Sequence, residues 1–373
     1  MAIQLFVPTF ATDEILEEIR ECLEKGWTGL GFKTVEIEAK WNEYTGHAHS
    51  HFLNSATSGL HLAINIFKEI DDWNDGDEIL TTPLTFVSSN HAILYERLKP
   101  VFVDIDQYLC LDPQDLERKI SDRTRAVLFV GMGGNTGQLE AIKAICVERG
   151  LRLILDAAHM SGTRLNGITP AGDATVYSFQ AVKTMPTADA GMICFKDEKL
   201  DSIARKKAWL GINKDTFSRS SDKGSYKWHY DVEYVGFKYH GSSIMASMAL
   251  VQLKYLDRDN AYRRQICSWY ERGFSNSEVR SIPIAPGCES SRHLYQIEVD
   301  NRDELMLALN GAEIYPGVHY RDNRHYQMFA EKEDSCPRST FISERLISLP
   351  LHMRLTKSDV DEVVRNVIKY ARV

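Results

Sequence analysis

Lys183 lies between two apolar runs, TVYSF and GMICF, and is followed by small and turn-forming residues. A lysine in such a loop is ordinarily a solvated surface group. An amine held at the end of a strand can instead form a Schiff base with an aldehyde, which makes it a candidate for covalent chemistry. Lys183 alone does not decide between these interpretations, so the residues that follow the other apolar runs become important.

Three other runs end in residues that could bind a ligand. The stretch NSATSGLHLAI opens an apolar helix with the small residues 55–59, so the exposed amides and hydroxyls of its first turn could hold a phosphate, although N-capping is the simpler interpretation. Phe86 follows the next run and is either a core residue or a ring that stacks on a ligand. Asp156 closes the run RLILD as either a helix N-cap or a carboxylate that needs a cationic partner.

Together these groups meet the needs of one cofactor, pyridoxal 5′-phosphate. Its phosphate needs a helix N-terminus, its ring a stacking partner, its pyridinium nitrogen a carboxylate and its aldehyde a lysine. Ser178 adds a hydroxyl at the end of the run before Lys183. The combination is more specific than any of its members, so the sequence predicts a pyridoxal phosphate site with Lys183 as the Schiff-base lysine.

A glycine-rich stretch, VGMGGNTG at 130–137, suggests a different cofactor. It follows a strand and precedes a helix, as a dinucleotide-binding loop does. Its spacing is not GxGxxG, however, and it arrives at about the fourth strand of the chain. No suitably placed acidic residue closes a following strand, unless Asp156 takes that role. Nicotinamide binding is therefore not favoured.

The elements that must position these residues alternate between strands and helices. Short strands separated by amphipathic helices predict an α/β fold with a mostly parallel sheet that is covered on both faces. Ligands of such sheets bind beyond the carboxyl ends of the strands. The predicted strands lie at 51–54, 78–82, 101–104, 126–130, 152–156, 175–179 and 192–195.

The pattern changes near residue 243. A stretch of one or two long helices precedes the strand candidates SIPIA and HLYQIEV and a final helix, TKSDVDEVVRNVIKYA. The sequence therefore predicts a large α/β domain over 1–249, which includes an N-terminal helical segment, and a smaller C-terminal α+β domain over 250–373.

Composition places the chain among ordinary globular proteins and excludes several functions. Of its 373 residues, 43% are hydrophobic and 26% charged, and no apolar run is long enough to span a membrane. Seven scattered cysteines without a CxxC pair predict neither a disulfide framework nor a metal site. No signal peptide is evident, so a cytoplasmic location is expected. The net charge of −8 argues against binding to nucleic acid or to anionic membranes.

The chain resembles a known family, the nucleotide-sugar aminotransferases of the DegT–StrS group. The likeness runs from GWTGLG at 26–31 almost to the C-terminus. Its strongest elements are D-A-A-H, S-F-x-x-x-K and S-L-P-L-H, in that order. The resemblance implies the type I fold of pyridoxal phosphate transferases, a seven-stranded sheet and a homodimer with the active site at the subunit interface.

The resemblance also implies roles for individual residues at the cofactor. Lys183, Asp156 and His159 would be catalytic: Lys183 would carry the cofactor, Asp156 would pair with the pyridinium nitrogen, and His159 would hydrogen-bond the phenolic oxygen. Phe86 would stack on the ring. The phosphate ligands implied are Ala56, Thr57 and Ser178.

Other implied contacts concern the second subunit and the substrate. The segment GFKYH, with Lys238 and His240, would reach the cofactor of the neighbouring subunit. The substrate contacts implied are Thr28, His319, Tyr320 and His325. This chain departs from the family at several positions. It has Ala56 where glycine is usual, residues 187–191 where a Thr-Gly-Glu-Gly-Gly-like run is common, and HYRDNRH where H-Y-x-P-x-H is frequent. In the interface loop it has Lys238 and His240 where Asn and Arg, or Lys and Asn, are often found.

The implied activity is transfer of an amino group, with glutamate as donor, to a nucleotide-linked keto-sugar. A 4-keto-6-deoxy sugar is expected because it is frequent in the family. The products would serve surface polysaccharides such as lipopolysaccharide O-antigen, or glycosylated metabolites. Two alternatives stay open. One is a sugar dehydratase with the same cofactor; such members carry histidine at the lysine position, so Lys183 favours the aminotransferase. The other is a non-catalytic sensor or regulatory protein, which should have lost the lysine or the aspartate, and this chain keeps both.

Overall fold

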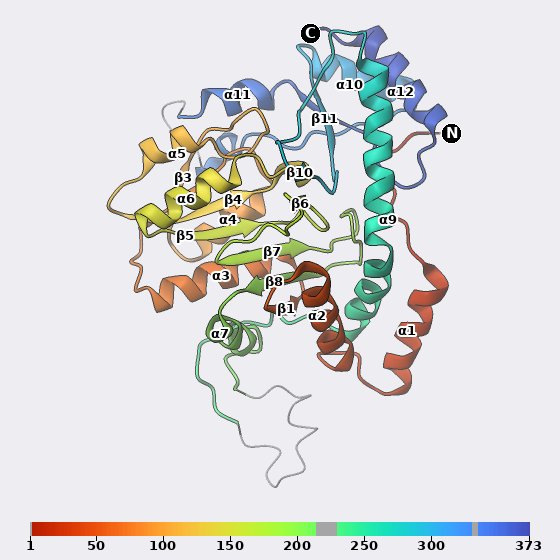
Figure 1. Cartoon of the computed structure of the whole chain (residues 1–373). Helices are drawn as coiled ribbons and strands as arrows, with labels where there is room; N and C mark the ends of the chain where they lie inside the picture. Colours follow the sequence, from red (N-terminus) through yellow and green to blue (C-terminus); the bar gives the residue numbers. More distant parts are fainter. Residues whose placement is uncertain (1, 214–229, 330–334) are drawn as a thin grey trace.

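The computed structural model describes residues 2–213, 230–329 and 335–373. A seven-stranded sheet in the order β1-β8-β7-β5-β4-β2-β3 lies at its centre (Figure 1). All neighbours from β3 to β7 pair in parallel, whereas β8 is antiparallel to both β7 and β1. The predicted mostly parallel sheet of seven strands is therefore confirmed. Its strands are β1 (His49–Leu53), β2 (Glu78–Thr81), β3 (Lys99–Phe102), β4 (Thr124–Val130), β5 (Arg152–Asp156), β7 (Ala174–Ser178) and β8 (Gly191–Phe195).

Helices cover both faces of this sheet, as its apolar strands require. Strand β4 shows why, because its alternate side chains enter different cores. Ala126 and Leu128 pack with helices α3, α4 and α7, whereas Val127 and Phe129 pack with α2, α6 and α9. These helices are α2 (Phe32–Thr45), α3 (Ala56–Ile70), α4 (Val87–Tyr95), α6 (Leu139–Arg149), α7 (Glu198–Ala208) and α9 (Ser243–Phe274).

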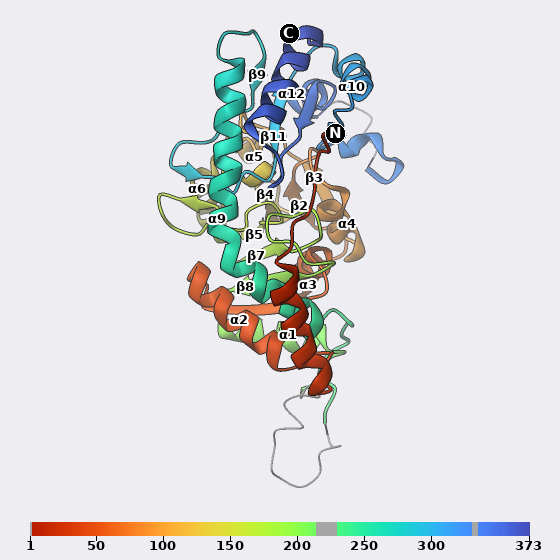
Figure 2. The ribbon, with the colours of Figure 1, turned by 90° about the vertical axis from the view of Figure 1, so that its right-hand side faces the viewer.

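Helix α9 links the sheet to the C-terminal part of the chain. Its 32 residues form one continuous helix, which contacts α1 (Thr12–Glu24) and α2 in one part and α12 (Lys357–Tyr370) in another (Figure 2). The C-terminal part has its own core and a three-stranded sheet in the order β12-β11-β9. The predicted division between 249 and 250 falls inside α9, and the division into two domains stays a prediction.

The remaining elements are short. They are β6 (Arg164–Leu165), β9 (Arg280–Ser281), β10 (Cys288–Glu289), β11 (Tyr295–Glu298), β12 (Leu346–Leu349), α5 (Pro113–Lys119), α10 (Arg302–Gly311), α11 (Pro337–Ser343), η1 (Met132–Gly134), η2 (Asn323–His325) and η3 (Gln327–Phe329).

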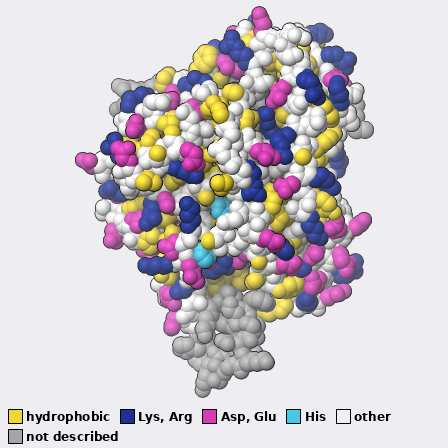
Figure 3. All heavy atoms as spheres, viewed as in Figure 1, with side chains coloured by type: hydrophobic (Ala, Val, Ile, Leu, Met, Phe, Trp, Pro, Cys, Tyr) yellow, Lys and Arg dark blue, Asp and Glu magenta, His cyan; other side chains and the backbone are white. Residues whose placement is uncertain are grey.

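The surface carries mixed charge. Basic and acidic side chains are interspersed over the face drawn in Figure 3. All seven cysteines are free thiols. Among the described residues, no helix has the length and apolar character needed to cross a membrane.

Candidate active site

A cavity of about 480 Å³ opens at the carboxyl ends of the parallel strands. This is the edge at which ligands bind in open α/β sheets. The sheet brings together nine of the predicted site residues there, although the sequence spreads them over 265 positions, from 56 to 320. The nine are Ala56, Thr57, Phe86, Asp156, His159, Ser178, Lys183, His319 and Tyr320.

Asp156 ends strand β5 at the floor of the cavity and is 4% exposed. Ser89 donates its hydroxyl to Oδ2 at 2.7 Å, and the amide of Ala158 donates to Oδ1 at 3.1 Å. Burial raises the pKa of the Asp156 carboxyl, and the nearby Lys183 opposes that rise only in part. A cation placed against this carboxyl would therefore stabilise its ionised form, which is what a pyridinium nitrogen supplies.

Lys183 lies in the loop between β7 and β8. Because these strands are antiparallel, the loop begins and ends at the cavity edge of the sheet. The loop folds on itself: the amide of Lys183 donates to Gln180 O at 2.8 Å, and that of Ala181 donates to Ala188 O at 3.0 Å. Burial lowers the pKa of the Lys183 amine to about 8, with Asp156 opposing the shift. The amine can therefore be neutral, and nucleophilic, near physiological pH.

His159 presents a defined nitrogen to the cavity. Its Nδ1 accepts the amide of Gly133 at 3.2 Å, so the proton of the neutral ring is on Nε2. Burial, with the charge of Lys183 nearby, holds the pKa of His159 well below its ordinary value. Nε2 lies 3.2 Å from the Tyr320 hydroxyl. The ring therefore offers a neutral N–H donor at the edge of the cavity, as a phenolic oxygen requires.

Phe86 occupies the N-cap position of helix α4 and is 56% exposed. Its ring lies 5.9 Å from that of Tyr320, at an interplanar angle of 49°. Most phenylalanines are buried, so an open ring on a cavity is available to a flat ligand. This environment fits the predicted stacking role better than the alternative of a core residue.

The first turn of helix α3 forms another wall. Ser55 caps the helix by accepting the amide of Ser58 at 3.1 Å. The amides of Ala56 and Thr57 precede any intrahelical acceptor, so they are available to an anion. Gly191 permits the close approach of the sheet, because a Cβ there would lie 2.6 Å from the Ala56 amide. The first turn of α3, together with Asp156, Lys183 and Phe86, fits pyridoxal phosphate.

Four predicted contact residues do not line the cavity. Thr28 and His325 are exposed. Lys238 is also exposed, and its Nζ lies 3.4 Å from the centre of the Trp209 ring. His240 hydrogen-bonds through Nδ1 to the carbonyl of Gly241. Within one chain, the structure therefore brings together the predicted cofactor residues but not the predicted cross-subunit pair.

The structure also adds residues that sequence reasoning missed. Ser89 holds Asp156, and its position three residues after Phe86 on one helix was an available signal. Gln180 lines the cavity beside Lys183. The ring of His293 lies 4.3 Å from that of His159 and stacks on Phe6, and no local pattern indicates this.

Comparisons with known proteins identify the family. The model of the DegT/DnrJ/EryC1/StrS aminotransferase family matches residues 10–368. The chain belongs to this family. It is 34% identical to the spore coat polysaccharide biosynthesis protein SpsC of Bacillus subtilis, over 98% of this chain and 97% of that protein.

Solved structures agree with this assignment. The aminotransferase TlmJ of Streptoalloteichus hindustanus is 30% identical, with a TM-score of 0.90 and 98% of each chain covered. A putative sugar aminotransferase of Streptococcus pneumoniae, Spr1654 in its PMP form, is 26% identical, with a TM-score of 0.90 and the same coverage. The protein described here is thus a sugar aminotransferase of a pyridoxal phosphate-dependent family.

Proposed function

We propose that this protein binds pyridoxal phosphate in the 480 Å³ cavity and transfers an amino group from glutamate to a nucleotide-linked 4-keto-6-deoxy sugar. The observation that carries the proposal is the convergence of Lys183, Asp156 and Phe86 on one cavity beside the N-terminus of α3. When bound, pyridoxal phosphate stabilises negative charge on the reacting carbon and carries the amino group between substrates.

The residues of the chain have separate tasks in this reaction. The Lys183 amine, with a pKa of about 8, takes a proton from one carbon and returns it to another. The Asp156 carboxylate holds the ring nitrogen and keeps it protonated. The Nε2–H of His159 donates to the phenolic oxygen, and Phe86 fixes the plane of the ring. The amides of the first turn of α3 bind the phosphate.

We propose the substrate and the pathway from what the relatives are described to do. SpsC is described as a spore coat polysaccharide biosynthesis protein, and Spr1654 as a putative sugar aminotransferase. A surface polysaccharide, such as lipopolysaccharide O-antigen, is therefore the destination that we propose for the amino sugar, made in the cytoplasm. His319 and Tyr320, which line the cavity, would contact the sugar.

A charge count supports a shared active site. A phosphate monoester carries nearly two negative charges, and the N-terminus of a helix offers about half a positive charge. Among the described residues, Lys183 is the only lysine or arginine that lines the cavity, and it is assigned to the aldehyde. We therefore propose that Lys238 or His240 of a second subunit supplies the missing cation, which makes the homodimer the active unit.

Subunit mixing tests this arrangement. A Lys183→Ala chain and a chain changed at both Lys238 and His240 should each be impaired as homodimers. After subunit exchange in equal amounts, activity should return to roughly a quarter of the wild-type value, because half of the dimers are mixed and each holds one intact site. No recovery after confirmed exchange would show that the pair acts within its own chain, or not at all.

Product analysis tests the reaction itself. The purified protein is incubated with the cofactor, glutamate and a panel of uridine, thymidine and guanosine diphosphate keto-sugars. Mass spectrometry should detect an amino sugar together with 2-oxoglutarate. A product that has lost water without gaining nitrogen would instead support the dehydratase. Failure to bind added cofactor would support the sensor protein.

A further inference from the structure

Two aromatic rings on the cavity come from distant parts of the chain. Phe86 ends the loop 82–86, which follows strand β2, whereas Tyr320 belongs to the C-terminal part. Their centroids lie 5.9 Å apart, and the Tyr320 hydroxyl is 3.2 Å from Nε2 of His159. The placement of the two rings relative to each other therefore depends on the contacts that hold these two loops together.

Asn323 joins the two loops directly. Its backbone amide donates to Pro83 O at 2.8 Å, and its side-chain amide donates to Thr85 O at 2.8 Å. Thr85, whose carbonyl accepts the side-chain bond, directly precedes Phe86. Its Oδ1 accepts from the side chain of Asn90 at 3.0 Å. Asn323 is 1% exposed, so these bonds are shielded from water.

Asn90 extends the connection to the sheet. Its Nδ2 also donates to Thr82 O at 3.1 Å, and its Oδ1 accepts the hydroxyl of Thr81 at 2.9 Å. Asn90 is fully buried. The two facing amides thus connect the end of β2, the start of α4 and the loop after Tyr320, and each has partners for both its donor and its acceptor.

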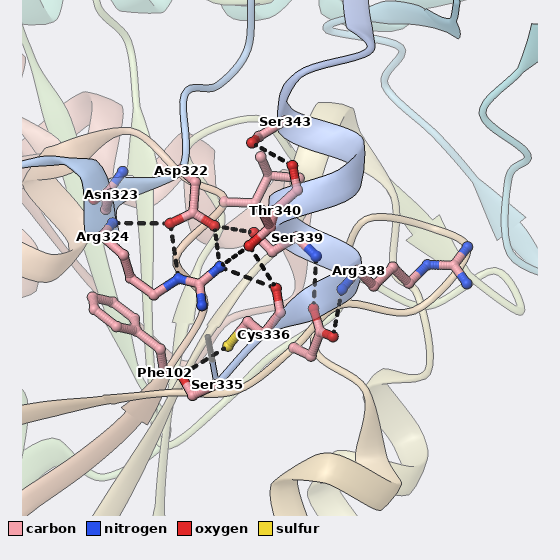
Figure 4. Close-up of polar contacts among 12 residues, drawn as sticks. Phe102, Asp322, Asn323, Arg324, Ser335, Cys336, Arg338, Ser339, Thr340 and Ser343 are labelled. Carbon is pink, nitrogen blue, oxygen red and sulfur yellow. Dashed lines mark hydrogen bonds and ion pairs between the residues drawn. The ribbon is translucent and has the colours of Figure 1, made fainter. Parts of the chain in front are cut away.

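The residues on either side of Asn323 hold it rigidly (Figure 4). Arg324 donates from Nε and a terminal nitrogen to Asp322, at 3.0 and 2.7 Å, and this ion pair is buried. Arg324 also donates to Cys336 O and to the hydroxyl of Thr340, at 3.0 and 2.7 Å. Asp322 accepts the hydroxyl of Ser339 at 2.7 Å. The turn is therefore fastened to helix α11.

Helix α11 is in turn fastened to the sheet. Asp104, just after strand β3, accepts the amides of Arg338 and Ser339 at 2.9 and 2.8 Å. Figure 4 shows the contacts of Asp322 and Arg324 with α11. The Asp322–Asn323–Arg324 turn thus has fixed supports on both sides, and none of its three residues lines the cavity.

From this geometry we propose that Asn323 is a positioning residue for the cofactor. By binding loop 82–86 to the turn after Tyr320, it fixes the position of Phe86, the ring on which the flat cofactor stacks, relative to Tyr320 and the C-terminal part of the chain. The inference rests on the cofactor site of the proposed function. It also departs from the family resemblance, because this turn lies in HYRDNRH, where the family frequently has H-Y-x-P-x-H.

The test compares Asn323→Ala with Ser339→Ala. The control removes one buried hydrogen bond from Asp322, in the same network, and leaves every contact of Asn323 intact. We expect both variants to lower the melting temperature. We expect only Asn323→Ala to weaken binding of pyridoxal phosphate to the apoprotein, by roughly tenfold, equivalent to about 1.4 kcal/mol. Fluorescence quenching on titration and the circular dichroism of the bound cofactor are the readouts.

Hydrogen exchange of the apoprotein provides a readout without cofactor. The amides of residues 82–90 should exchange faster in Asn323→Ala than in Ser339→Ala. If both variants change exchange, affinity and melting temperature in proportion, Asn323 has only a structural role and the proposal is overturned.

A milder variant keeps the test decisive if Asn323→Ala does not fold. Asn323→Ser retains a small polar side chain and the backbone bond to Pro83 O, and it should show the same pattern with smaller changes. Wild-type affinity and dichroism in Asn323→Ser would overturn the proposal. Wild-type protein that binds no cofactor would contradict the proposed function, whereas the exchange comparison would still decide the role of Asn323.

Discussion

The two ends of the central sheet present different kinds of cavity. The amino ends of β4, β5 and β7 border a cleft of about 750 Å³, larger than the 480 Å³ cavity at the carboxyl ends. The larger cleft is rich in charge, and several of its charges are paired, such as Arg152 with Asp71 at 2.7 Å and Lys143 with Glu140 at 2.9 Å. Among the described residues, Lys183 in the smaller cavity has no ion pair at all.

This difference shows which property marks a reactive site. Volume and charge count both favour the cleft at the amino ends. Ion pairs close to solvent, however, contribute little to the free energy of unfolding and do not by themselves mark a reactive group. Within the part of the chain that the structure describes, neither Lys183 nor Asp156 forms an ion pair. Burial lowers the pKa of Lys183 and raises that of Asp156, so the neutral form of each is favoured. Groups in that condition are the ones that a cofactor or substrate can engage.

Replacing one lysine in each cavity should give the largest difference in turnover between the two ends of the sheet. Lys183→Ala should lower turnover by about 10³-fold or more, because it removes both the covalent anchor and the proton carrier. Lys143→Ala, in the other cleft, should leave turnover within roughly twofold of wild type, as most surface changes do. Steady-state rates with saturating cofactor measure both. Near-normal turnover in Lys183→Ala would refute the site.

Titration of Lys183 gives the next expected effect. Its pKa in the folded protein, about 8, is below the ordinary 10.5, so acylation of the apoprotein at Lys183 should be half-maximal near pH 8. Asp156→Asn should move this midpoint lower still, because the charge of Asp156 raises the pKa of Lys183. Peptide mass spectrometry over a pH series measures the modification. A midpoint near 10.5 would mean that the amine is not desolvated.

The same shift has a consequence for stability. Between about pH 8 and 10.5 the unfolded chain binds the proton that folded Lys183 has released. The contribution of Lys183 to the free energy of unfolding therefore increases with pH through that window. In Lys183→Met this contribution is absent, so the difference in stability between the two proteins should vary with pH there.

The carboxyl end of the sheet was predictable from sequence for a local reason. Its main groups lie at the end of an apolar run or in the loop that follows it, so recognition of the strand also locates the residue, as for Asp156 and Ser178, the last residues of β5 and β7. The seven strands were found because β-branched runs alternate with helices. The predicted limits differ from the observed ones by two residues at most, as at β1 and β3.

The residues of the site that sequence reasoning missed depend on contacts that no local pattern encodes. His293 meets His159 only because α9 returns the chain to the sheet. Asn323 and Asn90 are 233 positions apart and bond only after both parts have folded. The predicted roles of Lys238 and His240 require a second chain, so one chain neither supports nor contradicts them.

The smallest effect is expected at the cleft on the amino side, where Arg152 donates to both carboxylate oxygens of Asp71, at 2.7 and 2.8 Å. Asp71→Asn removes the charge and leaves Arg152 stacked over the ring of Phe67. Both partners are partly exposed, so we expect a loss of about 0.2–1 kcal/mol in unfolding free energy and no change in turnover. Because salt screens such pairs, the loss should shrink in high salt. Urea unfolding at two salt concentrations measures it. A large loss of turnover would give this cleft a catalytic role and remove the contrast between the two ends of the sheet.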